Sequence, residues 1–185
     1  MSITHEVSVA AGHAIQGIRA GEAKLAWHEI AEGIAPSIQV TSIAFEPSSA
    51  LPISCTVDGV GAAPPLAFNA VPPQTRSLAI VCEDPDAPFL SPYVHWLVYG
   101  IPPETDAVDA QTQHDHRLGQ NGKSEPGFAP AAPPPGHGVH HYHFQVFALD
   151  TPLELGQGAE RDALVEQMKG HVLGWGELVG TYERE

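Results

Sequence analysis

Hydrophobic residues along this chain fall into short runs and alternating patterns that proline and glycine separate. Two apolar runs, at residues 78–82 and 94–99, are typical of central β-strands that are buried on both faces, and they predict strands over roughly residues 77–83 and 94–101. Residues 140–149 form a further strand-like segment, residues 37–70 contain shorter ones, and residues 173–182 suit a last strand. Short strands with this punctuation predict a mainly β domain of the sandwich type.

Two segments have helical character. Residues 12–33 contain good helix-forming sequence, although two glycines interrupt it. Residues 160–172 place three apolar side chains four residues apart on one face: Leu164, Met168 and Val172. We expect helices in both segments and a long loop over residues 102–138.

The 140–149 segment predicts a small pocket at one of its ends. Alternation along a strand puts five side chains on one face: His140, Tyr142, Phe144, Val146 and Ala148. This row is apolar except at its start, where an imidazole and a phenol lie two residues apart, as the mouth of a small pocket requires. In the 94–101 segment we expect His95, Leu97 and Tyr99 to share a face in the same way, again with the histidine first.

The segment Asp84-Pro85-Asp86-Ala87-Pro88 lies between the two buried runs. Proline fixes φ and removes a backbone donor, so this turn is stiff and holds two carboxylates at the edge of the core. Rigid loops on a buried scaffold often carry functional sites. An ordinary acidic turn is the alternative interpretation, and the two nearby histidine-bearing strands favour a site.

Composition limits the classes of partner. The chain has 185 residues, which suits one domain, and a net charge of −14 with only eight scattered Lys and Arg residues. Such a field repels nucleic acid and anionic bilayers, so we expect neither as a partner. No apolar run approaches a membrane span, residues 1–6 lack the features of a signal peptide, and Cys55 and Cys82 have no disulfide framework. We therefore expect a cytoplasmic protein with reduced thiols.

The sequence gives little support to metal, cofactor or nucleophilic chemistry. Four histidines cluster near the third strand, but they have no cysteine partners and no HExxH spacing: His137, His140, His141 and His143. The chain also lacks a nucleophile elbow and a glycine-rich phosphate loop that opens a helix. We expect neither a metal nor a cofactor.

Several motifs together resemble the phosphatidylethanolamine-binding protein family, specifically its bacterial Raf-kinase-inhibitor-like branch (the YbhB/YbcL group). The resemblance covers roughly residues 38–184 and rests mainly on four motifs: Asp84-Pro-Asp-Ala-Pro88, His95-Trp96, Pro133-Pro-Pro-Gly-His-Gly138 and His140-His-Tyr-His-Phe144. It implies a sandwich of antiparallel strands with a few flanking helices. We expect a single domain over residues 1–185, with residues 1–36 as an N-terminal extension packed on it.

The resemblance also implies one small anion-accepting cavity. Its ligand-binding residues would fall on seven positions: Asp84, Asp86, Pro88, His95, Pro133, His140 and Tyr142. The sequence departs from the family pattern in the loop before Pro133, at His141 where an arginine is usual, and at residues 122–124, so specificity is not carried over. No Lys or Arg is expected near the cavity, which leaves backbone N–H groups, the Tyr142 hydroxyl and protonated histidine as donors.

The resulting functional hypothesis is a binding protein for a small anion such as phosphate or phosphoethanolamine. A regulatory role with a protein partner follows only by analogy with kinase-inhibitor members of the family. An enzyme that uses the Asp/His/Tyr pocket for acid–base chemistry is the alternative. Because relatives are often dimers, we expect a homodimer.

Overall fold

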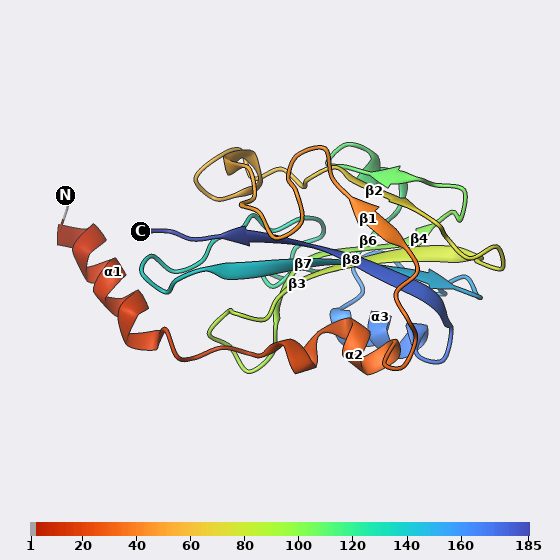
Figure 1. Ribbon diagram of the computed structural model, residues 1–185, viewed down its shortest axis with the longest axis horizontal. Helices are drawn as coiled ribbons and strands as arrows, with labels where there is room; N and C mark the ends of the chain where they lie inside the picture. Colours follow the sequence, from red (N-terminus) through yellow and green to blue (C-terminus); the bar gives the residue numbers. More distant parts are fainter. Residues whose placement is uncertain (1–2) are drawn as a thin grey trace.

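The chain forms two antiparallel sheets with few helices, as the computed structural model shows for residues 3–185 (Figure 1). Met1 and Ser2, which begin the segment where we expect no signal peptide, lie outside the described residues. In spatial order, the larger sheet contains β6 (Arg117–Leu118), β4 (Tyr93–Ile101), β3 (Ser77–Asp84), β7 (His140–Leu149) and β8 (Val172–Tyr182). The smaller sheet contains β1 (Gln39–Thr41), β2 (Leu66–Asn69) and β5 (Ala107–Val108). The predicted mainly β sandwich is confirmed.

The helices are α1 (Ile3–Ile15), α2 (Ala26–Ile30) and α3 (Arg161–Met168), with short 3-10 turns η1 (Glu22–Lys24), η2 (Ile53–Cys55) and η3 (Thr112–Asp115). Figure 1 shows α2 and α3 on one side of the larger sheet and the smaller sheet on the other. Within residues 3–185, no helix combines the length and the apolar character that crossing a bilayer requires.

The continuous apolar run of β3 reflects a core on each side of the larger sheet. Its even-numbered residues, such as Ile80 and Cys82, face the smaller sheet, and Ala79 and Val81 face α2 and α3. All eight residues of β3 are buried. A strand covered on both faces carries apolar side chains on both of them, which is why residues 78–82 do not alternate between apolar and polar.

Antiparallel pairing brings three chemistry-bearing strand ends together. β3 pairs with β4 on one side and β7 on the other, and Glu83 lies opposite both Val94 and His143. The end of β3 at Asp84 therefore lies beside the beginnings of β4 and β7. This edge of the sheet is where the candidate site lies.

A β-bulge in β4 overturns the expected facing of His95. Cys82 pairs with Trp96 and Glu83 pairs with Val94, which leaves His95 as an extra residue between them. An extra residue in one strand reverses the alternation beyond it. His95 and Trp96 consequently lie on the sandwich side, whereas Leu97 and Tyr99 pack on the helix side, so the prediction that the three residues 95, 97 and 99 share a face is wrong.

The helical segments are shorter or displaced relative to expectation. The helix expected within residues 12–33 is divided, because α1 ends at Ile15 and α2 covers only five residues. The helix expected over residues 160–172 ends at Met168, and the chain turns at Gly170 with a φ of 80°. Glycine adopts a positive φ at little cost, so the turn at Gly170 follows the end of the helix, and β8 begins two residues later at Val172.

Candidate ligand-binding site

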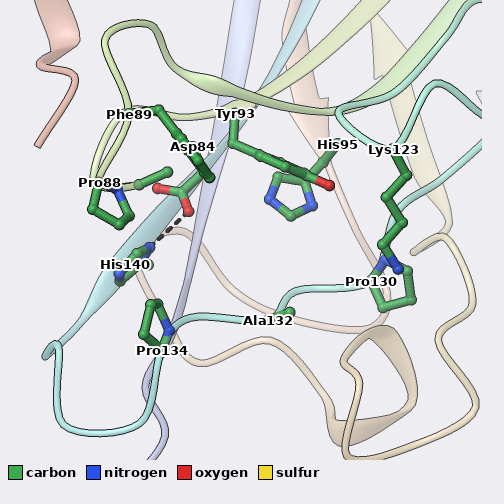
Figure 2. A pocket seen from close by; sticks show the side chains of 11 residues that line it. Asp84, Pro88, Phe89, Tyr93, His95, Lys123, Pro130, Ala132, Pro134 and His140 are labelled. Carbon is green, nitrogen blue, oxygen red and sulfur yellow. Dashed lines mark hydrogen bonds and ion pairs between the residues drawn. The ribbon is translucent and has the colours of Figure 1, made fainter. Parts of the chain in front are cut away.

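A cavity of about 200 Å³ opens at the edge where β3 ends and β4 and β7 begin (Figure 2). Four of the seven residues predicted for the site line it: Asp84, Pro88, His95 and His140. The volume is below the roughly 300–1,000 Å³ of pockets for drug-sized ligands, so the cavity suits a small molecule.

The side chains of Asp84 and Asp86 lie in different surroundings. Asp84 is buried at the cavity, where its Oδ2 lies 2.7 Å from His140 Nδ1 and its Oδ1 accepts the Asp86 N–H at 2.8 Å. The Asp86 carboxylate lies outside the cavity lining, pairs with Arg19 and accepts the His141 backbone N–H at 2.7 Å. Burial opposes ionisation of Asp86, but hydrogen bonds from His141 and Arg19 outweigh it and lower the pKa of that carboxyl.

His95 presents a lone pair to the cavity. Its Nδ1 lies 2.7 Å from the Ala129 carbonyl oxygen, and a carbonyl only accepts, so Nδ1 carries the proton. Burial lowers the pKa of His95, against the opposing effect of the nearby Asp84, and neutral imidazole then has an unprotonated Nε2. Among the described residues Nε2 has no hydrogen-bond partner, so it is free for a ligand. It accepts when His95 is neutral and donates when His95 is protonated.

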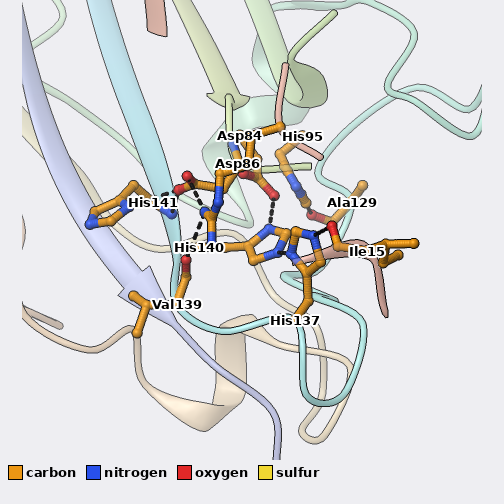
Figure 3. Close-up of polar contacts among 10 residues, drawn as sticks. Ile15, Asp84, Asp86, His95, Ala129, His137, Val139, His140 and His141 are labelled. Atoms are coloured by element: carbon orange, nitrogen blue, oxygen red, sulfur yellow. Dashed lines mark hydrogen bonds and ion pairs between the residues drawn. The ribbon is translucent and has the colours of Figure 1, made fainter. Parts of the chain in front are cut away.

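His140 belongs to a buried hydrogen-bonded chain (Figure 3). Its Nε2 lies 2.7 Å from His137 Nδ1, and His137 Nε2 lies 2.9 Å from the Ile15 carbonyl oxygen. When Asp84 is ionised, each of three contacts needs one proton on a ring nitrogen: His140 to Asp84, His140 to His137, and His137 to the Ile15 carbonyl. Two neutral imidazole rings carry only two such protons. A complete set of hydrogen bonds in the unit of Asp84, His140 and His137 therefore includes one additional proton, whose charge offsets that of the carboxylate.

Tyr142 and Pro133 are buried outside the cavity lining. The Tyr142 ring lies edge-on to His95, with 5.0 Å between ring centroids. Burial raises the pKa of its hydroxyl, which has no hydrogen-bond partner within residues 6–185. Pro133 adjoins Pro134, which lines the cavity in its place.

Sequence reasoning missed several lining residues, above all Tyr93 and Lys123. The Asn121 side chain shapes the loop that carries Lys123, because its Oδ1 accepts the Lys123 N–H at 2.8 Å and its Nδ2 donates to the Gly127 carbonyl at 3.0 Å. Lys123 then reaches the cavity, so the expectation that no Lys or Arg lies nearby is wrong. The unusual Gly122-Lys123-Ser124 segment directly after Asn121 was the available signal.

The four histidines of the cluster fall into two groups. His137 and His140 join the cavity network, whereas His141 pairs with Asp86 and His143 lies 3.0 Å from Glu177 Oε2. Across residues 6–185, no three His, Cys, Asp or Glu side chains converge in a manner that suits a metal ion.

Comparison with known proteins identifies the family of the chain. A family model described as phosphatidylethanolamine-binding protein matches residues 41–183. A UPF0098 protein of Pyrococcus horikoshii is 41% identical over 156 residues, which cover 80% of this chain and 78% of that protein. A UPF0098 protein of Methanothermobacter thermautotrophicus is 38% identical over 147 residues, which cover 76% of this chain and 95% of the relative.

Solved structures show the same architecture. A homologue of phosphatidylethanolamine-binding protein from Chlamydia trachomatis superposes with a TM-score of 0.76 at 34% identity, covering 82% of this chain and 100% of that one. YbcL of E. coli superposes with a TM-score of 0.76 at 28% identity, covering 80% and 99% of the two chains. With the matching sequence model, these likenesses show that the chain belongs to the phosphatidylethanolamine-binding protein family.

Proposed function

We propose that the protein binds a small ligand with a phosphate-like anionic group in the cavity lined by Asp84, His95, Lys123 and His140. The observation that carries this proposal is the local charge of the cavity. With the additional proton the Asp84–His140–His137 unit is neutral, and Lys123 adds a positive charge at the lining. The side chains that line the cavity are therefore neutral to positive in sum, although Glu125 acts electrostatically on Tyr93 from outside the lining and the whole molecule has a net charge of −14.

Distance and screening make the local charge decisive. At an effective dielectric constant of about 20, two unit charges about 4 Å apart interact with roughly 4 kcal/mol. Exposed carboxylates more than about 8 Å away are largely screened at physiological salt. Lys123 therefore influences an anion in the cavity more than the dispersed acidic residues do.

The cavity also offers groups for both ends of a zwitterion. The Tyr93 hydroxyl and Lys123 are donors to an anionic oxygen, and His95 becomes another donor when it is protonated. The Asp84 carboxylate and neutral His95 Nε2 are acceptors for an ammonium group. This combination suits phosphoethanolamine better than a simple cation.

Anion binding is expected to strengthen as the pH falls. Burial lowers the pKa of His95 in the free protein, so the ring is neutral at pH 7. An anion beside Nε2 stabilises the imidazolium and raises that pKa, which couples binding to proton uptake. Affinity should therefore increase from pH 8 to pH 5.5.

Acid–base catalysis on a small substrate is the second candidate. It is favoured by one observation, an unprotonated Nε2 on His95 that is available beside the buried Asp84–His140 pair. Such a nitrogen is suited to general-base chemistry. Turnover that both His95→Ala and His140→Ala abolish would support an enzyme, whereas a ligand recovered unchanged supports binding alone.

Isothermal titration calorimetry with three probes tests the proposal. We expect phosphoethanolamine and inorganic phosphate to bind more tightly at pH 5.5 than at pH 8, and ethanolamine to bind weakly at both. Phosphorus NMR of the recovered phosphoethanolamine shows whether it was converted. Equal affinity at all pH values, or preferential binding of ethanolamine, would contradict an anion site.

Regulation of a protein partner and homodimer formation are further proposals that rest on family analogy alone. Gel filtration of the full chain measures the oligomeric state directly. An apparent mass near twice 19.6 kDa would support a homodimer.

A further inference from the structure

The N-terminal segment joins the two loops that wall the cavity. On one side, the Ala20 and Gly21 N–H groups donate to the carbonyl oxygens of Ala87 and Pro85 at 3.2 and 2.9 Å. On the other side, Gln16 Nε2 donates to the Gly136 carbonyl at 2.7 Å. Arg19 contacts both loops, because it pairs with Asp86 and donates to the Val139 carbonyl at 3.2 Å. This segment, residues 15–21, is called the clasp below, and it precedes the region that the family model matches.

The clasp is connected to the cavity through His137. Its Nε2 donates to the carbonyl of Ile15, the last residue of α1. Its Nδ1 is the hydrogen-bond partner of His140 Nε2. His140 lines the cavity, and its other nitrogen is engaged by Asp84. A ligand that hydrogen-bonds to His140 must therefore take the position that His137 now holds.

We propose that ligand binding and docking of α1 compete for His140, so that an anion entering the cavity displaces His137 and releases α1. This inference rests on the proposed anion site. Replacement of His137 by the anion needs no further proton, because the additional proton of the Asp84–His140–His137 unit can remain on His140. The resulting imidazolium donates from Nδ1 to Asp84 and from Nε2 to the anion, as a charge-assisted hydrogen bond.

The wall that carries His137 gives a second connection to α1. Pro134 lines the cavity, and the next residues, Pro135 and Gly136, pack against α1. A Cβ added at Gly12 would lie 1.9 Å from the Pro135 carbonyl oxygen, so the helix approaches this loop at backbone distance. Movement of the loop away from His140 therefore disturbs the contact with α1.

α1 depends on this docking for its stability. It has 13 residues, and most of its described side chains are exposed. Isolated helices shorter than about 12–15 residues are marginal in water. A released α1 should fray, and its backbone amides should exchange hydrogen rapidly.

Hydrogen–deuterium exchange of the full-length chain tests the proposal, with inorganic phosphate and phosphoethanolamine as probes. Either probe at saturation should reduce the protection of amides in residues 7–15. Protection in β3 should not fall, because the central strand stays paired on both sides. Calorimetry on the same samples measures the affinity for each probe separately.

Gly12→Ala should undock α1 through a collision with Pro135, which lies outside the cavity lining, and Gly17→Ala is its matched control. The added methyl group collides with Pro135 at position 12, whereas nothing lies within 4 Å of a Cβ at position 17. Gly12→Ala should lower α1 protection without ligand and should bind phosphate about 2- to 10-fold more tightly, since no clasp contact is lost on binding. Gly17→Ala should match the wild type. Gln16→Ala, which removes one clasp hydrogen bond, should show the same effect in milder form.

The outcomes separate the two proposals. Phosphate binding with unchanged α1 protection would overturn the competition while leaving the anion site in place. A Gly12→Ala protein with an exposed α1 and unchanged affinity would do the same. Failure of both probes to bind the wild type and Gly12→Ala would overturn the anion site and the competition together.

Discussion

His95 and Trp96 are neighbours in β4, yet their side chains lie on the same face of the larger sheet. The bulge opposite Cys82 and Glu83 produces this arrangement. Trp96 packs in the core and donates to Gln113 Oε1 at 2.8 Å, while His95 turns to the cavity. Bulges often re-aim a side chain beside a functional site. The bulged residue of β4 is thus His95, the residue that places an imidazole at the cavity.

The pH dependence of stability tests the burial of His95. Its pKa in the folded protein lies below the usual value of 6.5, so the unfolded chain binds more protons as the pH falls through 6.5. This contribution to stability is full above pH 6.5 and declines below it. Urea unfolding at pH 7.5 and pH 5 should therefore show a smaller acid loss for His95→Gln than for the wild type. An equal loss would show that His95 is not protected from protonation.

Tyr142→Phe should stabilise the free protein. The hydroxyl is buried without a hydrogen-bond partner among the described residues, and such a group costs about 1–3 kcal/mol. We expect the variant to raise the free energy of unfolding by about 1 kcal/mol in denaturant titrations. Tyr99→Phe is the matched control, because the Tyr99 hydroxyl donates to the Gly156 carbonyl and its loss should destabilise. Destabilisation of both variants would mean that Tyr142 has a partner.

Lys123→Gln should weaken phosphate binding by about 2- to 5-fold, since an attractive charge at an exposed side chain is lost. Calorimetry at pH 7 measures the dissociation constant. Lys169→Gln changes an exposed lysine that follows α3 and serves as the control for the loss of one positive charge. If both variants weaken binding equally, the effect reflects net charge and not the cavity.

The fold and four of the residues that line the candidate site could be predicted from sequence, in part because regular strands obey simple alternation. β7 is regular from His140 to Ala148, so the row of His140, Tyr142 and Phe144 lies on the sandwich side as predicted. The face on which each side chain of such a strand lies follows from parity alone. The facing of His95 did not follow, because its position depends on a bulge that nothing in the local pattern indicates.

The loops were less predictable for a different reason. Lys123 reaches the cavity only because hydrogen bonds of the buried Asn121 side chain set the path of its loop. Asp84 and Asp86 are separated because the first belongs to β3 and the second follows it in the turn, where Arg19 and His141 hold it. These contacts join residues that are far apart in sequence, so local patterns do not reveal them. The clasp was missed for the same reason.

Glu83→Ala should destabilise the protein strongly. Glu83 is fully buried on the helix side, where it accepts hydrogen bonds from Arg161 Nε at 2.8 Å, the Ala26 N–H at 2.9 Å and Gln145 Nε2 at 2.8 Å. Removal of one partner from a buried ion pair costs about 3–5 kcal/mol. Urea unfolding measures this loss, with Glu166→Ala at an exposed position of α3 expected to change stability by no more than about 0.5 kcal/mol. A loss of similar size in both variants would contradict the assigned role of Glu83.

Histidine side-chain NMR tests the anion site most directly. A ¹⁵N-labelled protein at pH 7 should show His95 as a neutral ring protonated at Nδ1, with the signal assigned by its loss in His95→Gln. Saturating phosphate should shift the His95 Nε2 resonance from the value of an unprotonated nitrogen towards that of a protonated one. Unchanged His95 and His140 resonances, under conditions where calorimetry shows phosphate bound, would place the anion elsewhere and contradict the account.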